Sequence, residues 1–472
     1  MAKRIFRTLR AGFFAAACAA LMPVSASAET LADAMASAYE HNGLLDQNQA
    51  LLRAADEDAA ATYALLRPII NWYGNVTYTN SSAITASSAG LRAHSATNVA
   101  EMGLSLELLL YDNGATKLAV EASRETVLAT RQALISVEQQ VLFDAVQSFL
   151  HVVRDARIVE LRQNNLRLVA RELQAAQDRF EVGEVTRTDV ALAEASLAGG
   201  RADLAVSQGQ LMQSQEYFAS VTGHQPGALV APTSAPKMPK SGDEVKAVAV
   251  RAHPDMIRAK HEITVAELNV ARTRASLGPT VKLKGAYGVQ ETFSETYESQ
   301  VGSLGFNVTA PIYQGGRLSA LLRKSMAQRD ATRAALHVTR HNVRRSAGNA
   351  WAQLSAAGAQ LAASGRQVEA SRVAFEGVRE EAKLGSRTTL DVLTAEQDLL
   401  DAESNRITAR AAQYIAAYGV LASMGQLTAE QLNLRVELYD PEAYYNMVKD
   451  APTLTSKRGK KLDQVLRAIG KE

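Results

Sequence analysis

The sequence predicts an α+β membrane protein built as a tandem repeat, in which strand hairpins are followed by very long coiled-coil helices. Three observations carry this prediction. The second half of the chain repeats the first, long proline-free tracts keep a heptad pattern, and four short runs alternate between apolar and polar residues.

The internal repeat has an offset of 202 residues and needs no gap from about residue 111 to residue 223. YDNG at 111–114 then meets YQGG at 313–316, and Gly183 meets Gly385. Within each half we expect the order helix, strand, strand, long helix, turn, long helix. The predicted divisions are a signal peptide at 1–28, a first repeat at 29–223, a linker at 224–245, a second repeat at 246–430 and a polar C-terminal extension at 431–472.

The first 28 residues have the pattern of a secretory signal, with four cations, an apolar stretch at 11–22 and the small residues Ala26-Ser27-Ala28. Cleavage after Ala28 would leave 444 residues and change the formal net charge from +2 to −2, which removes any basic excess that would favour nucleic acid. Cys18, the single cysteine, is an alternative site as an acylated lipoprotein residue, but the preceding Ala15-Ala16-Ala17 lacks the usual leucine.

Four runs of about nine to eleven residues alternate with period two, at 70–79, 101–110, 281–290 and 303–312. This length suits strands that cross a bilayer on a tilt, although a half-buried soluble sheet alternates in the same way. We expect an interfacial aromatic girdle from residues near the strand ends: Trp72, Tyr73, Tyr78, Tyr111 and Tyr313. The polar faces carry candidate lumen residues: Glu101, Glu107, Lys282 and Lys284.

Four strands are too few to close a barrel, so the chain must associate. Three copies would give twelve strands, and their helices would together wall a tube.

Two tracts of 68 residues, 115–182 and 317–384, predict rods about 100 Å long. In the first tract, alternating steps of three and four give an apolar seam that includes Leu142, Phe149, Ala156 and Ala170, with glutamines at 163 and 177.

Each pair of rods is joined by a short turn, at 182–190 and 384–392. Gly183 and Gly385 are suited to end a helix in the left-handed conformation. Asp189 and Asp391 fall in the first turn of the next helix, where a carboxylate is favoured, and Thr186 and Thr388 are candidate caps. Helix capping is therefore one interpretation of these aspartates.

The turns VGEVTRTDV and LGSRTTLDV, within a tandem repeat of hairpins and paired rods, resemble those of the TolC family of outer-membrane export channels. The resemblance covers roughly residues 30 to 430. It implies a homotrimer whose twelve-stranded β-barrel in outer-membrane lipid is continuous with a periplasmic α-helical barrel. It also implies that this trimer receives drugs or proteins from an inner-membrane transporter, of ABC or RND type, through a periplasmic adaptor.

The resemblance also implies a closed periplasmic tip. Asp391 would supply an acidic ring, and Arg387 would reach towards Asp189. Thr394 and Ala382 depart from the family pattern, because they stand where a second ring aspartate and a tyrosine link can occur. This departure predicts a looser gate or one latched through other groups.

No nucleophile elbow, phosphate loop or paired-carboxylate motif occurs, so we expect no enzyme and no cofactor. His337 and His341 have metal-ligand spacing, but neighbouring arginines favour a solvated helix face and no metal. The tail after Pro441 is expected to be a partly disordered periplasmic extension. The competing hypothesis is an exported coiled-coil scaffold or adhesin without a pore, which leaves the four strand runs unexplained.

Overall fold

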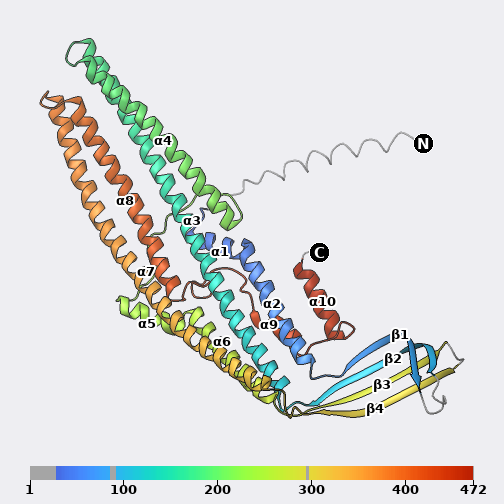
Figure 1. The fold of residues 1–472 in the computed structure, drawn as a ribbon. Helices are drawn as coiled ribbons and strands as arrows, with labels where there is room; N and C mark the ends of the chain where they lie inside the picture. The colour runs from blue at the N-terminus through green and yellow to red at the C-terminus, as the bar shows by residue number, and fades with distance from the viewer. Residues whose placement is uncertain (1–27, 85–91, 294–296, 471–472) are drawn as a thin grey trace, which may run out of the picture. The chain divides into compact units, whose positions relative to one another are not determined.

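The computed structural model describes residues 28–84, 92–293 and 297–470 (Figure 1). The predicted signal peptide therefore lies, apart from Ala28, outside the described residues, as does Cys18. Among the described residues, no helix is both long enough and apolar enough to cross a membrane.

The first half of the chain contains six elements. A single helix was expected before the strands, but the structure has two. They are α1 (Leu31–His41), α2 (Gly43–Ala64), β1 (Ile69–Ile84), β2 (Arg92–Tyr111), α3 (Ala115–Glu181) and α4 (Arg187–Thr222). The break between α1 and α2 arises at Asn42, whose side chain accepts a hydrogen bond from the Leu44 amide and so begins a new helix.

The second half repeats this order with α5 (Gly242–Ala252), α6 (Pro254–Ala275), β3 (Thr280–Thr292), β4 (Tyr297–Thr309), α7 (Arg317–Lys383) and α8 (Thr389–Ser423). Here His253 ends α5 and caps α6, and Pro254 occupies the first helical position. The two long helices, α3 and α7, have 67 residues each, one fewer than predicted.

The four strands form one antiparallel sheet in the order β1-β2-β3-β4. They have 16, 20, 13 and 13 residues, so the predicted length of nine to eleven was wrong. The missed residues of β1 and β2 are mostly Thr, Ser, Asn and Ala, which pair in register although they carry no apolar alternation.

The C-terminal extension is helical, with α9 (Pro441–Val448) and α10 (Lys457–Gly470), so the expectation of partial disorder was wrong. Tyr444, Val448 and Leu462 are buried and pack against Ala60 of α2. The extension therefore contributes apolar side chains to a core that its polar composition concealed.

The chain divides into two compact units, and each draws on both repeats. The first combines residues 28–41, 144–237 and 356–417, and its largest fully buried side chains are Phe149 and Phe218. The second combines residues 42–143, 238–355 and 418–470; it holds the sheet, and its core includes Leu52, Val127 and Leu142.

The heptad seam of α3 differs from the prediction in one of its two rows. Phe149, Val152 and Val159 are buried as expected, but further along the buried positions are Asp155, Val169 and Ala176. Ala156, Gln163 and Ala170 are exposed. The apolar preference of the sequence favoured Ala156, whereas the fold buries Asp155 and satisfies its carboxylate with Arg154 and Ser214.

Candidate functional site

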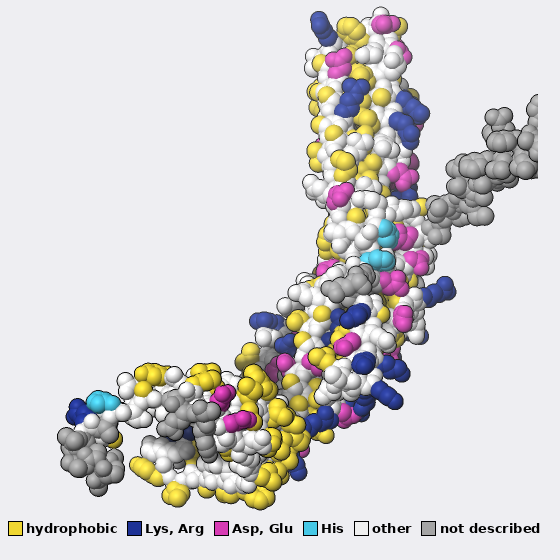
Figure 2. Space-filling model, turned by 90° about the vertical axis from the view of Figure 1, so that its right-hand side faces the viewer, with side chains coloured by type: hydrophobic (Ala, Val, Ile, Leu, Met, Phe, Trp, Pro, Cys, Tyr) yellow, Lys and Arg dark blue, Asp and Glu magenta, His cyan; other side chains and the backbone are white. Residues whose placement is uncertain are grey.

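One face of the sheet is apolar and exposed. Ile70, Trp72, Leu104, Tyr287 and Phe306 are between 52% and 72% exposed. The register brings them together across the strands, with Trp72 opposite Leu104 and Leu104 opposite Tyr287. Apolar side chains gather over this end of the molecule in Figure 2. A soluble protein rarely leaves so large an apolar surface uncovered, and hydrocarbon is the environment that suits it.

The opposite face carries the charged residues that the alternation predicted. Lys282 donates to Glu107 over 2.7 Å, and Lys284 is paired in register with Glu107. Glu101 accepts a hydrogen bond from the Tyr73 hydroxyl at 3.0 Å. The structure therefore brings all four candidate lumen residues onto one polar face.

Tyr73 does not belong to the exposed aromatic set, contrary to the prediction. Alternation along β1 places it on the polar face, opposite Trp72, where it is half-buried beside Gly103 and Gly288. A Cβ at Gly103 would lie 2.6 Å from the Tyr287 carbonyl oxygen and 3.0 Å from the Tyr73 hydroxyl. Trp72, Tyr78, Tyr111 and Tyr313 are each at least 50% exposed, as a girdle requires.

The two helical hairpins end in turns of the same geometry. Gly183 has φ +80° and Gly385 has φ +77°, so both adopt the left-handed conformation predicted for them. The amides that follow each glycine bond back to the preceding helix, Glu184 to Arg179 and Ser386 to Glu381.

Both aspartates cap the helices that follow these turns. Thr186 and Asp189 form a reciprocal capping box. Thr388 and Asp391 form the same box: the Thr388 amide donates to the Asp391 carboxylate at 2.9 Å, and the Asp391 amide donates to the Thr388 hydroxyl at 3.2 Å. Hydrogen bonds from Thr186 hold the pKa of Asp189 below its usual value, and those from Thr388 do the same for the pKa of Asp391. The capping interpretation is therefore confirmed for both aspartates.

Arg387 lies in the second turn and donates to Glu381 at 2.8 Å, within its own hairpin. Thr394 is exposed and its hydroxyl donates to the Leu390 carbonyl, while Ala382 is half-buried in the last turn of α7. Within one chain these residues thus make local contacts. Val182 and Leu384, beside the tip glycines, are 71% and 86% exposed.

A buried glutamate that sequence reasoning missed connects the two hairpins. Glu396 of α8 is only 4% exposed, and its Oε1 accepts from Asn165 of α3 at 2.6 Å. Its Oε2 is buried and has no hydrogen-bond partner among the described residues. Burial, with the nearby charge of Glu172, raises the pKa of Glu396 to about 7, although Arg379 opposes the shift. The sequence did offer one sign of this burial, because Glu396 lies four residues from both Val392 and Leu400, at the spacing of a buried helical stripe.

Glu396 borders a polar cavity of about 220 Å³ between α3, α4 and α8. Arg162 lines the same cavity and pairs with Asp203 at 2.7 Å, while its own Nε is buried without a partner. Gly199 and Gly200 of α4 leave the space open. Two unsatisfied polar atoms on one cavity indicate room for ordered water.

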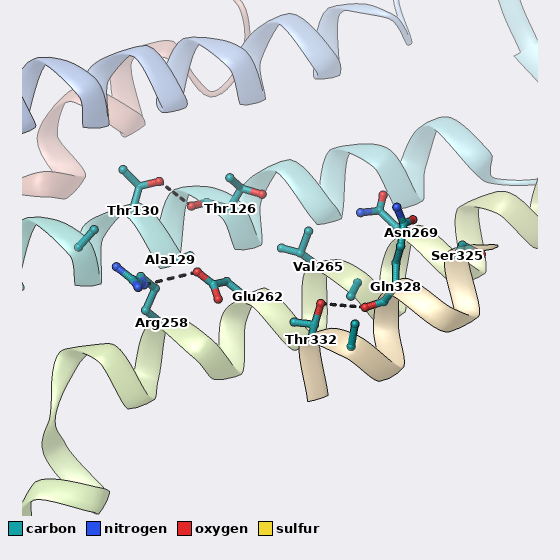
Figure 3. Close-up of a pocket in the computed structure, with 13 residues that line it drawn as sticks. Thr126, Ala129, Thr130, Arg258, Glu262, Val265, Asn269, Ser325, Gln328 and Thr332 are labelled. Carbon is teal, nitrogen blue, oxygen red and sulfur yellow. Dashed lines mark hydrogen bonds and ion pairs between the residues drawn. The ribbon is translucent and has the colours of Figure 1, made fainter. Parts of the chain in front are cut away.

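A groove of about 690 Å³ lies between α3, α6 and α7 in the second unit (Figure 3). Its charged residues are paired, since Arg258 contacts Glu262 at 3.4 Å and Asp255 at 3.9 Å. The remaining lining is mainly alanine and threonine with Gln328 and Asn269. This groove presents a packing surface and not a reactive centre.

In the described parts of the chain, no group of three or more His, Cys, Asp or Glu side chains is placed to hold a metal ion. His337 and His341 are exposed on α7, as the solvated-face interpretation expects.

A sheet with one exposed apolar face, joined to long helical hairpins with capped turns, defines a channel protomer of the outer-membrane type. The comparisons agree. The chain matches the family model described as outer membrane efflux protein over residues 34–224 and 248–426. It is 34% identical to the outer membrane efflux protein BepC of Brucella suis biovar 1 (strain 1330) over 428 residues, which cover 90% of this chain and 92% of BepC.

Two further comparisons extend this result. The outer membrane protein TolC of Vibrio cholerae serotype O1 is 23% identical over 86% of this chain and 92% of its own length. The crystal structure of the Campylobacter jejuni CmeC outer membrane channel is similar in fold, with a TM-score of 0.71, 16% identity and 90% of each chain covered. The chain therefore belongs to the outer membrane efflux protein family. It is an outer-membrane exit duct of an efflux or secretion system.

Proposed function

We propose that the chain works as a homotrimer, a passive and gated duct without enzymatic activity. Three four-stranded sheets would form a twelve-stranded barrel with Glu101, Glu107, Lys282 and Lys284 facing its lumen. The observation that carries this proposal is the two-faced sheet, because its edges β1 and β4 need neighbours and its apolar face needs lipid.

The partners follow from the same architecture. A periplasmic adaptor would join the helical tips to an inner-membrane transporter of ABC or RND type. The exposed Val182 and Leu384 at the two tips supply apolar contacts for such an adaptor. The signal peptide would be cleaved after Ala28, and mass spectrometry of the mature N-terminus distinguishes this from acylation at Cys18.

The gate would be formed by the second tip. Three copies of Asp391 would make an acidic constriction, and Arg387 would exchange its contact with Glu381 for Asp189 of a neighbouring hairpin. The lowered pKa of Asp391 supports this proposal, because its carboxylate is held in the ionised form by Thr388. A ring of carboxylates selects cations through the local field.

Single-channel conductance in a planar bilayer tests the gate. Asp391→Asn removes the charge and keeps a side chain able to cap α8, while Asp391→Ala removes both. Asp398→Ala, an exposed carboxylate two turns further along α8, is the matched control. We expect small cation-selective openings that lose selectivity in both Asp391 variants and keep it in the control.

Two other results would change the proposal. Openings that are unaffected by the Asp391 variants would keep the duct and exclude Asp391 as its constriction. A protein that is soluble without detergent and never inserts would favour the scaffold without a pore.

A further inference from the structure

Helix α10 has two chemically distinct faces. On one side Leu462 is buried in the core of the second unit, and Val465, one turn further along the same side, is half-buried. Four exposed cations lie at positions that helical spacing places on the other side: Lys457, Lys460, Lys461 and Arg467. We name these four residues the cationic face of α10.

The cations of this face have no acidic partner, since none of them takes part in an ion pair among the described residues. Arg458 is different, because it pairs with Asp450 at 2.7 Å and donates to the Asn446 carbonyl. Arg458 thus holds α10 against α9, and the cationic face is left available for a partner outside the chain.

The position of α10 relative to the sheet is fixed by contacts within the second unit. Leu462 packs with Ala60, four residues before the end of α2, and β1 begins at Ile69. Arg67 donates to the Ala451 carbonyl at 2.9 Å, so the segment between α9 and α10 lies at the entrance to β1 (Figure 1). Leu454 of this segment is 76% exposed.

The first residues of β1 have the character expected where a strand enters a membrane. Ile70 and Trp72 are exposed on the apolar face within four residues of Ile69, and a tryptophan at this place is typical of the lipid–water interface. Leu454 and the start of α10, where Lys457 lies, are therefore close to the first residues of β1, on the side from which the helices extend.

We propose that the cationic face of α10 binds anionic phospholipid headgroups of the periplasmic leaflet, with Leu454 entering the interface beside β1. Ammonium and guanidinium groups attract phosphate, and an amphipathic basic element at a membrane surface is the usual form of such a contact. This contact would fix the depth and tilt of the barrel independently of the tip and its gate.

The test uses the full chain in lipid nanodiscs and follows amide hydrogen exchange of residues 457–470. One disc contains phosphatidylethanolamine alone, and the other has roughly a quarter phosphatidylglycerol. We expect exchange to be slower by about tenfold in the anionic disc at low salt, and this difference to disappear at high salt.

Two variants make the test specific. The variant K457Q/K460Q/K461Q/R467Q should exchange at the same rate in both discs, while the charge-conserving K457R/K460R/K461R should behave like the wild type. If the glutamine variant does not fold, the proposal is still tested by the lipid and salt dependence of exchange in the wild type and in the arginine variant.

Equal exchange of wild-type α10 in the two discs would overturn the proposal. A second assay, sedimentation of the protein with peptidoglycan sacculi, gives another result that would overturn the proposal. If the glutamine variant kept the difference in exchange between the two discs but no longer sedimented with sacculi, the cationic face of α10 would bind the cell wall and not lipid. Loss of Asp391-dependent selectivity would not affect this result, so the two proposals fail separately.

Discussion

The buried carboxyl of Glu396 makes the contact between the two helical hairpins depend on pH. Among the described residues, Glu396 accepts one hydrogen bond, from Asn165 of α3, and Glu172 of α3 adds a like charge. We expect the first turns of α8 to separate from α3 more readily as the pH rises, and Glu396→Gln to remove this dependence.

The size of the effect follows from the pKa. A carboxyl whose pKa rises from 4.5 to about 7 loses about 3 kcal/mol of docking free energy when it is fully ionised. The docked state binds more protons than the open state between these two values. The free energy of docking therefore becomes less favourable as the pH rises through that window, by about 2.5 kcal/mol from pH 5 to pH 8.

Amide hydrogen exchange of residues 389–400 in the detergent-purified protein measures this contact. After correction for the intrinsic rate, we expect wild-type protection to fall roughly seventyfold from pH 5 to pH 8, which corresponds to the same energy. The control is Glu194→Gln, because Glu194 is the repeat counterpart of Glu396 and is exposed. Unchanged wild-type protection across this range, or an equal fall in Glu396→Gln, would refute the reasoning.

Three further predictions concern other parts of the chain. Gly103→Ala should greatly reduce folded protein in the membrane fraction, because its Cβ would lie 2.6 Å from the Tyr287 carbonyl, while Gly305→Ala has open space and should not; equal yields would contradict this. Thr388→Ala should destabilise the start of α8 by about 1 kcal/mol through loss of its cap, seen as faster amide exchange there, and Thr388→Ser should keep the wild-type rate; equal rates in the alanine variant and the wild type would contradict this. Asp56→Asn should slow proteolysis of α9 strongly at pH 8 and more weakly at pH 5, because burial raises the pKa of Asp56 from 3.8 to about 6 and the cost of its ionisation grows from about 1.5 kcal/mol at pH 5 to about 3 kcal/mol at pH 8; an equal effect at both values would exclude this cause.

The long helices and the alternation of the strands could be predicted because both are local patterns. The rod predicted over 115–182 differs from α3 by one residue, and the charged strand residues lie on the face of the sheet that the alternation predicted. The ends of β1 and β2 could not be predicted, since residues such as Ser81 and Thr97 enter the sheet through backbone pairing alone.

The buried row of α3 shows why pattern alone misplaced part of the core. Asp155 and Ala156 are neighbours, and apolar counting selects the alanine. The structure buries the aspartate because Arg154 and Ser214 satisfy its oxygens, and these partners come together only when α3 meets α4.

By itself the sequence determined the repeat, the two pairs of rods, the capped turns at Gly183 and Gly385, and a sheet with one apolar and one charged face. Each of these follows from periodicity or from the backbone preference of a residue type. The tertiary structure alone decided that Glu396 is buried while its counterpart Glu194 is exposed, and that the segment before α10 lies at the entrance to β1. Burial and position depend on which helices meet, and equal residues in a repeat meet different neighbours.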